Sequence, residues 1–258
     1  MIAPEARFEG THTRLRAAGS RALRALGYEL RRSDSLGVAD ISAEHRALFE
    51  RVTPYTQTSL ERVVALADAV EYVVRRDIPG DFVECGVWRG GSAMVIALTL
   101  SRLGIRDRRL WLYDTFGVMP PAGEHDRDYA GRSVTGDTLE AVNNASHISG
   151  LTLSEVQRAM ASTGYPPEQI EYVRGLVEAT IPDKAPERIV LLRLDTDWYE
   201  STRHELVELY PRLEAGGVLI VDDYGHYAGA RKAVDEYFAS DPILLSRIDY
   251  TGRLAIKV

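Results

Sequence analysis

Residues 191–202 read LLRLDTDWYEST, an apolar run that ends in two aspartates and is followed by the start of a helix pattern. Residues 216–227, GGVLIVDDYGHY, repeat the arrangement, because an apolar run is again closed by Asp222 and Asp223. Short apolar runs bounded by turn residues are typical of buried strands. Each stretch therefore predicts a buried strand whose carboxyl end carries a pair of carboxylates.

Strands and helices alternate along most of the chain. Strands are predicted at residues 81–87, 108–114, 170–175, 188–195 and 217–223. Helices are predicted from Ser92 to about Leu103, Thr152 to Thr163, Glu200 to Leu213 and about Ala228 to Ala239. Such alternation indicates an α/β fold with a doubly wound, mostly parallel sheet. Residues 243–258 are predicted to form a hairpin that turns at Thr251 and Gly252 and adds an antiparallel strand.

The first fifty residues form a predicted N-terminal helical extension, and residues 51–258 form the main domain. A helix is expected from Ser59 to Arg76, with Ser59 or Thr58 as its N-cap. Residues 1–32 hold seven arginines and three glutamates, a local net charge of +4. We interpret this segment as a solvated helix that packs on the body or on a second subunit, so a homo-oligomer is expected. A basic arm that contacts a membrane or an acidic partner is the alternative.

The composition limits the possible partners and location of the protein. The chain has 258 residues, of which 45% are hydrophobic and 27% charged, as in soluble globular domains. Its formal net charge of −7 argues against a nucleic-acid-binding protein, which needs a basic surface. The single cysteine, Cys85, excludes an internal disulfide framework and suits a reducing cytosol. The sequence lacks a membrane-spanning apolar run and a secretory signal, so we expect a cytoplasmic protein.

Acidic residues end four of the predicted strands, at Glu84, Asp114, Asp195 and Asp222. In open parallel sheets, ligands bind beyond the carboxyl ends of the strands. All four carboxylates are therefore expected to gather on one rim of the sheet, where a ligand would bind.

Residues 83–92, VECGVWRGGS, place three glycines between a predicted strand and a predicted helix. Glycines at such a position allow a tight turn and let a ligand approach the backbone. Trp88 stands where a dinucleotide fingerprint has its second glycine, which disfavours NAD and FAD and favours a ligand without phosphates, such as S-adenosylmethionine. Asp114 can accept both hydroxyls of a ribose. The alternatives are a simple tight turn and an ordinary strand-end cap.

The second half of the rim carries four carboxylates. Asp195 and Asp197 are two residues apart, so they project from the same face of an extended chain. Asp222 and Asp223 should lie nearby, because these strands are expected to be neighbours. Carboxylates this close repel one another, and a hard divalent cation, Mg²⁺ or Ca²⁺, would relieve the repulsion. The cation would lower the pKa of a bound sugar or phenol hydroxyl, and Asp197 would remove the proton. Alternatively, each pair caps a helix or forms a turn.

Other residues near the rim have less specific interpretations. Residues 116–137 are too long and too polar for a simple connection and are predicted to be a mobile lid or a binding loop. Arg193 is expected to be solvated, with a substrate carboxylate as its alternative partner. Trp198 and Tyr199 are expected either to form an aromatic wall for a ring or to pack in the core. Cys85 is expected to be a small core residue.

Five ordered stretches resemble the macrocin O-methyltransferase family of bacterial sugar methyltransferases, which act on antibiotic and glycoconjugate sugars and depend on a metal. The stretches are FVECGVWRGGSA (82–93), LYDTF (112–116), LLRLDTDWYEST (191–202), LEAGGVLIVDDYG (213–225) and GARKAVDEYF (229–238). The resemblance covers about residues 50–245 and implies a class I methyltransferase fold, which is Rossmann-like, with S-adenosylmethionine as cofactor.

The resemblance also implies roles for individual residues. Mg²⁺ would bind Asp195, Asp222 and Asp223, and Asp197 would be the general base. Relatives usually carry an aromatic residue near Leu176 and an aspartate near Glu178, so the adenine pocket departs from the family pattern. The loop at residues 117–126 is individual to this chain and would set the acceptor. The S-adenosylmethionine site would be lined by Thr56, Thr58, Ser59, Glu84, Gly86, Gly91 and Ser92, with Asp114 on the ribose.

The predicted function is that of a Mg²⁺-dependent O-methyltransferase. It would move a methyl group from S-adenosylmethionine to a sugar hydroxyl of a secondary metabolite or glycoconjugate, a small glycosylated molecule. One alternative is a metal-dependent phosphatase that uses the Asp-x-Asp motif as its nucleophile. That design places the motif on the first core strand, usually with Thr or Val where this chain has Tyr199. A non-catalytic nucleoside-binding module is the other alternative, and it leaves the clustered acids without a role.

Overall fold

The computed structural model describes residues 40–117, 119–134 and 152–258. The chain divides into two compact units, residues 1–42 and 43–258, and every element described below belongs to the second. Most of the predicted helical extension lies outside the described residues, which include its last helix, α2 (Ala43–Val52). In the described ranges, no helix has the length and apolar character needed to cross a membrane.

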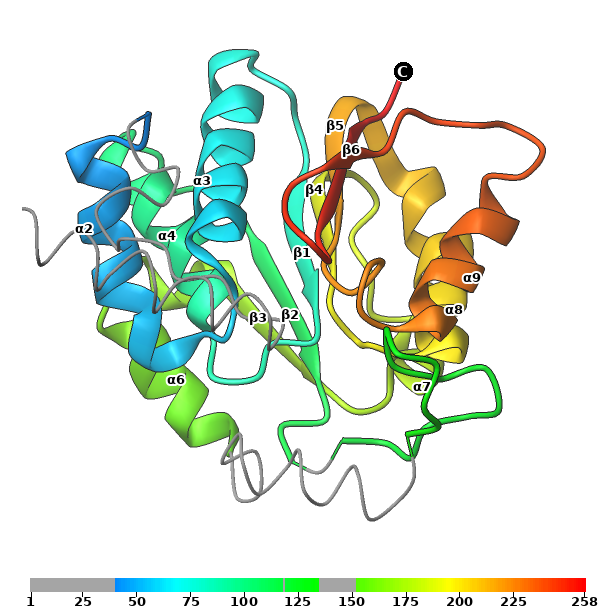
Figure 1. Cartoon of the computed structure of the whole chain (residues 1–258). Coiled ribbons are helices and arrows are strands. Elements are labelled where there is room, and N and C mark those ends of the chain that lie inside the picture. Colours follow the sequence, from blue (N-terminus) through cyan, green and yellow to red (C-terminus); the bar gives the residue numbers. More distant parts are fainter. Residues whose placement is uncertain (1–39, 118, 135–151) are drawn as a thin grey trace, which may run out of the picture. The chain divides into compact units, whose positions relative to one another are not determined.

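The described residues contain one sheet of seven strands in the order β3-β2-β1-β4-β5-β7-β6. Strands β1 to β5 are parallel, whereas β7 runs antiparallel to β5 and to β6 (Figure 1). The predicted mostly parallel sheet with an antiparallel C-terminal hairpin is therefore confirmed. The strands are β1 (Asp81–Cys85), β2 (Leu110–Asp114), β3 (Ile170–Arg174), β4 (Ile189–Leu194), β5 (Leu213–Val221), β6 (Ser246–Arg247) and β7 (Arg253–Ile256).

Helices cover both faces of this sheet, as Figure 1 shows. Helices α2, α3, α4 and α6 lie on one face of the sheet, and α7, α8 and α9 lie on the other. All six residues of β4 are buried, which explains why this central strand reads as an almost continuous apolar run. The helices are α3 (Leu60–Arg75), α4 (Gly91–Arg102), α6 (Leu153–Ala161), α7 (Val177–Thr180), α8 (Tyr199–Leu209) and α9 (Ala228–Tyr237).

Helix boundaries follow local chemistry. Ser59 is the N-cap of α3, as predicted, and its hydroxyl accepts a hydrogen bond from the Arg62 backbone amide at 3.2 Å. The helix predicted to reach Leu213 ends four residues earlier, at Leu209. Pro211 lacks the backbone N–H that a helix interior needs, so residues 210–212 form a short 3-10 turn before β5 begins.

The register of the sheet places the strand ends in one row. Cys85 lies opposite both Tyr113 and Leu194, and Leu194 lies opposite Val221. The residue after each strand continues the row, since the Asp195 amide donates to the Cys85 carbonyl at 2.8 Å. The fold therefore brings the acidic residues of several strands to one rim, as the sequence predicts.

Candidate active site

A cavity of about 520 Å³ lies at the carboxyl ends of the parallel strands. It is lined by residues of the glycine-rich loop and by the aspartates that follow β4 and β5. Of the site residues predicted from the sequence, Ser59 alone is absent from this lining. The predicted residues that line it are Thr56, Thr58, Glu84, Gly86, Gly91, Ser92, Asp114, Asp195, Asp197, Asp222 and Asp223.

Two glycines of the loop allow close approaches between backbone segments. Gly86 has a φ of +85°, and a Cβ atom there would lie 1.9 Å from the carbonyl oxygen of Asp195. At Gly91, a Cβ atom would lie 2.5 Å from the Cβ of Thr56. The loop after β1 thus packs directly on the acidic strand end on one side and on the segment before α3 on the other.

Asp114 braces the glycine-rich loop. Its Oδ2 accepts hydrogen bonds from the backbone amides of Val87 at 2.7 Å and Trp88 at 3.0 Å. Its Oδ1 accepts a hydrogen bond from the Phe116 amide at 2.7 Å. These bonds fit the strand-end cap that the sequence left open as the alternative role of Asp114, and its contact with a ribose stays a prediction.

Three carboxylates converge on the acidic side of the cavity. Asp195, Asp197 and Asp223 each offer an oxygen, and these oxygens lie within 4.8 Å of one another. The Oδ2 atom of Asp223 is buried and receives no hydrogen bond from a donor among the described residues. An all-oxygen set with an unsatisfied buried oxygen fits a hard divalent cation such as Mg²⁺.

Asp222 lies beside this group in a different environment. It is 2% exposed, and its Oδ1 accepts a hydrogen bond from Nη2 of Arg193 at 2.6 Å. Its Oδ2 pairs with Nη1 of Arg62. The group of three converging carboxylates thus contains Asp197 and not Asp222, and the role of Asp222 as a metal ligand stays a prediction.

The prediction that Arg193 is solvated was wrong. Arg193 is 2% exposed, and besides Asp222 it contacts Glu84 and Asp195, both at 2.7 Å. A buried guanidinium needs such partners, because the desolvation of an unpaired charge is costly. Burial opposes the charge of Arg193, but the three carboxylates outweigh it and raise its pKa. Glu84 and Arg193 are register partners on β1 and β4, so aligning the two predicted strand ends would have revealed their contact.

Four carboxyl groups of the rim have raised pKa values. Burial, followed by the neighbouring Asp195, raises the pKa of Asp197 to about 8. Burial also raises the pKa values of Asp195 and Asp223, with a contribution from nearby aspartates. Burial raises the pKa of Glu84 to about 7, although Arg193 opposes that shift. The two arginines thus do not fully compensate the cost of ionising these carboxyl groups, and bound protons or a cation would relieve it.

Asp197 occupies a strained backbone position. Its φ is +69°, in the left-handed region that non-glycine residues rarely adopt. Glu205, a fully buried residue of α8, accepts a hydrogen bond from the hydroxyl of Thr196 at 2.9 Å. Thr196 links Asp195 and Asp197, so Glu205 supports the turn that carries both carboxylates. The sequence pattern did not single out Glu205, since a glutamate on a helix is usually solvated.

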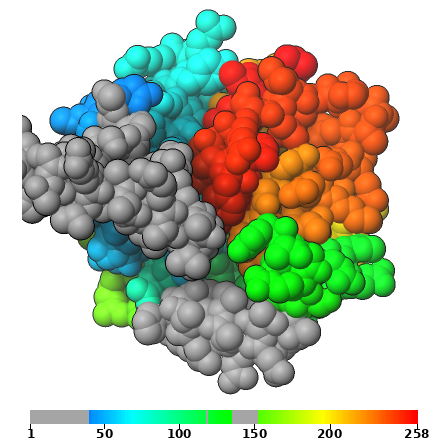
Figure 2. Space-filling model, viewed as in Figure 1, coloured from blue at the N-terminus to red at the C-terminus, as the bar shows by residue number. Residues whose placement is uncertain are grey.

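The loop at residues 119–134 forms the remaining wall of the cavity. Buried Asp126 accepts a hydrogen bond from the Tyr199 amide at 2.9 Å, and the Trp198 indole donates to the Pro120 carbonyl at 3.0 Å. Figure 2 shows the loop, in green, against the orange surface that includes the start of α9. This part of the predicted lid or binding loop is thus docked on α8 and α9. Trp198 is both buried and part of the cavity wall.

Comparison with known proteins identifies close relatives. Residues 20–254 match the family described as Macrocin-O-methyltransferase (TylF). The chain is 35% identical over 200 residues to demethyldecarbamoylnovobiocin O-methyltransferase of Streptomyces niveus, which covers 77% of this chain and 74% of that relative. It is 36% identical over 202 residues to 8-demethyl-8-(2,3-dimethoxy-alpha-L-rhamnosyl)-tetracenomycin-C 4'-O-methyltransferase of Streptomyces olivaceus, with 77% and 74% covered.

Solved structures agree with the sequence relationship. The structure of the O-methyltransferase NovP matches with a TM-score of 0.69 and 32% sequence identity. The match covers 79% of this chain and 82% of NovP. Because the family match spans residues 20–254 and the two Streptomyces relatives match 77% of this chain at 35% and 36% identity, the chain belongs to the macrocin O-methyltransferase family and is an S-adenosylmethionine-dependent O-methyltransferase with a class I fold.

Proposed function

We propose that this enzyme is Mg²⁺-dependent and methylates a hydroxyl of a sugar carried by a secondary metabolite or glycoconjugate. The observation that carries the proposal is the convergence of Asp195, Asp197 and Asp223 within 4.8 Å, in a cavity shared with the glycine-rich loop. A cofactor held at that loop and a hydroxyl held at the carboxylates would meet inside one enclosure.

The cofactor half is formed by backbone and small side chains. Gly86 and Gly91 line the cavity, so a bound cofactor would lie against the backbone there, and Ser92 lies in the first turn of α4. Thr56 and Thr58 line the cavity from the segment before α3. Asp114, which already braces the loop, accepts the ribose hydroxyls in this proposal. Glu84 also lines the cavity, held in place by Arg193.

In this proposal, Asp195, Asp222 and Asp223 bind the cation, and Asp197 is the general base. Bound Mg²⁺ would supply a Lewis acid that lowers the pKa of the acceptor hydroxyl. Asp197 would take the proton from that hydroxyl, and the oxygen would bond to the methyl carbon as its bond to the sulfonium sulfur breaks, which leaves S-adenosylhomocysteine. Burial is the main cause of the raised pKa of Asp197, and repulsion from Asp195 adds to it, so a cation that countered this repulsion would make Asp197 a better base at neutral pH. Through the cation, Asp195, Asp222 and Asp223 would orient the acceptor hydroxyl, so much of the catalysis would come from positioning the reactants.

The acceptor class follows from the relatives and from the cavity wall. The relative from Streptomyces olivaceus carries a rhamnosyl group in the name of its substrate. In this chain, Met119, Pro120, Trp198 and Tyr227 line the cavity, so the acceptor meets apolar and aromatic surface near the carboxylates. Such a wall suits the apolar face of a sugar ring. In the described part of the chain, nothing favours a phosphatase or a non-catalytic nucleoside-binding module.

The test is methyl transfer from labelled S-adenosylmethionine to a panel of glycosylated natural products and their sugar-free counterparts. We expect transfer to glycosylated compounds in Mg²⁺, a fall of at least about a hundredfold with excess chelator, and recovery when Mg²⁺ is restored. Calorimetry with S-adenosylhomocysteine is the control, since cofactor binding should survive chelation. Full activity in chelator would rule out the metal requirement, and transfer only to sugar-free compounds would rule out the sugar acceptor.

A further inference from the structure

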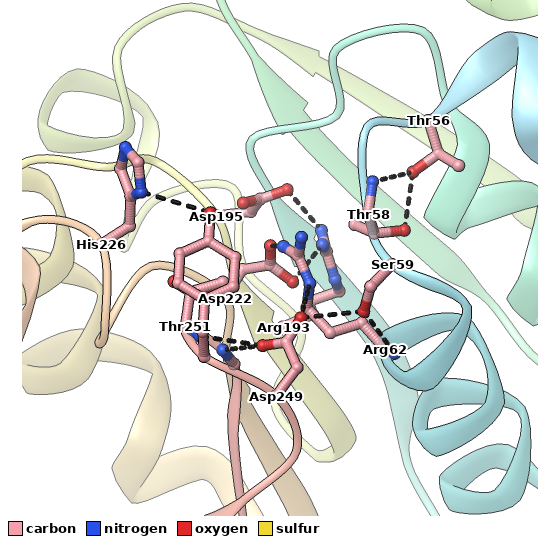
Figure 3. A network of polar contacts seen from close by, with 12 residues as sticks. Thr56, Thr58, Ser59, Arg62, Arg193, Asp195, Asp222, His226, Asp249 and Thr251 are labelled. Carbon is pink, nitrogen blue, oxygen red and sulfur yellow. Dashed lines mark hydrogen bonds and ion pairs between the residues drawn. The ribbon is translucent and has the colours of Figure 1, made fainter. Parts of the chain in front are cut away.

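Two sets of polar contacts, joined by the backbone between Thr58 and Ser59, connect the cofactor side of the cavity to the acidic rim (Figure 3). The first set begins at Thr56, whose hydroxyl oxygen accepts a hydrogen bond from the Thr58 amide at 3.1 Å. The next residue, Ser59, turns away from the cavity and donates its hydroxyl hydrogen to Oδ2 of Asp249 at 2.8 Å. The segment that lines the cofactor side is thus tied to the turn between β6 and β7.

Arg62 continues the network. Its Nε donates at 3.0 Å to the same Asp249 oxygen that Ser59 contacts, and its Nη1 pairs with Asp222. The side chain of Arg62 is 12% exposed, and those of Asp222 and Asp249 are 3% and 10% exposed. The guanidinium of Arg62, one turn into α3, therefore bridges carboxylates from two other elements in a largely water-free setting.

Asp222 is connected to the rest of the rim through Arg193. Its second oxygen is held by Arg193 at 2.6 Å, and Arg193 also contacts Asp195 at 2.7 Å. The hydroxyl of Thr251, in the same turn as Asp249, donates to the backbone carbonyl of Asp222 at 2.8 Å. Asp222 is therefore held at both its carboxylate and its backbone. Helix α3 and the turn between β6 and β7 contact both Asp222 and Ser59.

We propose that Arg62 is a positioning residue that couples cofactor binding at residues 56–58 to the orientation of Asp222 at the rim. A cofactor that orders the segment before α3 also fixes the start of α3, and with it the guanidinium that holds Asp222. Coupling between two sites requires a physical connection that both ligands bias, and this network provides one. The inference rests on the S-adenosylmethionine dependence of the enzyme, and its experiment with Mg²⁺ rests on the proposed function.

The first experiment needs no cation. Binding of S-adenosylhomocysteine is measured by calorimetry, in excess chelator, for the wild type, Arg62→Met, Asp222→Asn and the double variant. We expect Asp222→Asn to weaken binding by about fivefold when Arg62 is present and by less than about twofold in the Arg62→Met background. Equal effects of Asp222→Asn in both backgrounds would overturn the proposal, as would wild-type affinity in Arg62→Met.

Two further variants separate positioning from general loss of structure. Arg108 is also partly buried and donates to the carbonyls of Ile78 and Gly80, at the opposite ends of the strands. Arg108→Met therefore loses comparable bonds, and we expect it to leave the Asp222→Asn effect at about fivefold. Should Arg62→Met fail to fold, as judged by thermal unfolding, Arg62→Lys replaces it, because a lysine cannot reproduce the bridging geometry of the guanidinium.

A second binding experiment, with Mg²⁺ present, distinguishes a failure of this proposal from a failure of the proposed metal dependence. In the wild type, we expect Mg²⁺ and S-adenosylhomocysteine to tighten each other's binding by about fivefold, by the same factor in either order of addition. In Arg62→Met the factor should approach one, and an unchanged factor would overturn the proposal. If Mg²⁺ does not bind the wild type, the metal requirement fails, whereas the chelated double-variant cycle still decides the role of Arg62.

Discussion

At the scale of single residues, Asp197 differs most from an ordinary strand-end aspartate. Its left-handed backbone, with φ at +69°, stores strain that neighbouring contacts must support. The Trp198 amide donates to the Thr196 carbonyl at 2.8 Å, and buried Glu205 accepts the Thr196 hydroxyl. These contacts turn the chain sharply after β4 and direct Asp197 to the same small volume as Asp195 and Asp223. Strain of this kind is typical of functional sites.

Asp197→Asn tests the proposed base. An amide of the same shape cannot accept the acceptor proton, so we expect kcat to fall by about a hundredfold to ten-thousandfold. The cofactor contacts are elsewhere, so binding of S-adenosylhomocysteine by calorimetry should change by less than about twofold. Methyl transfer at saturating acceptor is the measurement. A kcat within about fivefold of the wild-type value would remove Asp197 as the base.

At the scale of elements, the sequence was sufficient to predict the rim. Apolar runs 191–194 and 218–221 predict adjacent buried strands, and parallel register then carries Asp195 and Asp222 to the same edge. The arginine partners could not be predicted in this way. Arg62 and Asp222 are 160 residues apart, and their contact depends on how α3 packs beside the end of β5. The spacing of apolar residues shows which face of a helix or strand is buried, but it does not show which charged side chains of different elements will contact one another.

The loop after β1 allows a matched test of close packing. In Gly86→Ala, the new Cβ would lie 1.9 Å from the Asp195 carbonyl oxygen, so the strand ends must move apart. Gly104 also has a positive φ, +77°, but nothing lies within 4 Å of its Cβ position. We expect Gly104→Ala to lose about 1–2 kcal/mol of unfolding free energy from backbone strain alone. We expect Gly86→Ala to lose at least about 2 kcal/mol more, because overlap adds to strain.

Urea unfolding followed by circular dichroism measures both glycine variants. Gly86→Ala should also reduce binding of S-adenosylhomocysteine, because the displaced strand end belongs to the cavity, whereas Gly104→Ala should bind normally. Equal losses of stability in the two variants would show that the approach of Gly86 to Asp195 is not tight in solution.

At the scale of the whole molecule, charge is distributed unevenly. The chain has a formal net charge of −7, and a group of aspartates is enclosed at one rim with two arginines. Burial disfavours the charged carboxylates and so raises the pKa values of Asp195 and Asp223, and repulsion from neighbouring aspartates adds to the rise. If the rim binds a cation as proposed, protons and the cation compete for the same carboxylates, and the stability of the folded state depends on which of them is available.

This dependence predicts how pH and Mg²⁺ act together on stability. The pKa of Asp197 is about 8 in the folded protein, compared with an ordinary value of 3.8. Between these values the folded state binds more protons than the unfolded chain, so without metal the contribution of Asp197 is complete at low pH and is lost as pH rises through about 8. Bound Mg²⁺ competes with the protons, and its stabilisation should therefore grow over the same range.

Thermal unfolding in chelator and in Mg²⁺, at about pH 6 and about pH 8.5, checks this expectation. At about a hundredfold excess over its Kd, Mg²⁺ should add about 3 kcal/mol at the higher pH, and clearly less at the lower pH, where protons occupy the carboxylates. Potassium chloride at matched ionic strength is the control for screening and should give no such difference. A Mg²⁺-induced rise in Tm that is equal at both pH values, or larger at pH 6, would contradict the raised pKa values as the source of the linkage, because competition with bound protons can only weaken metal binding as pH falls.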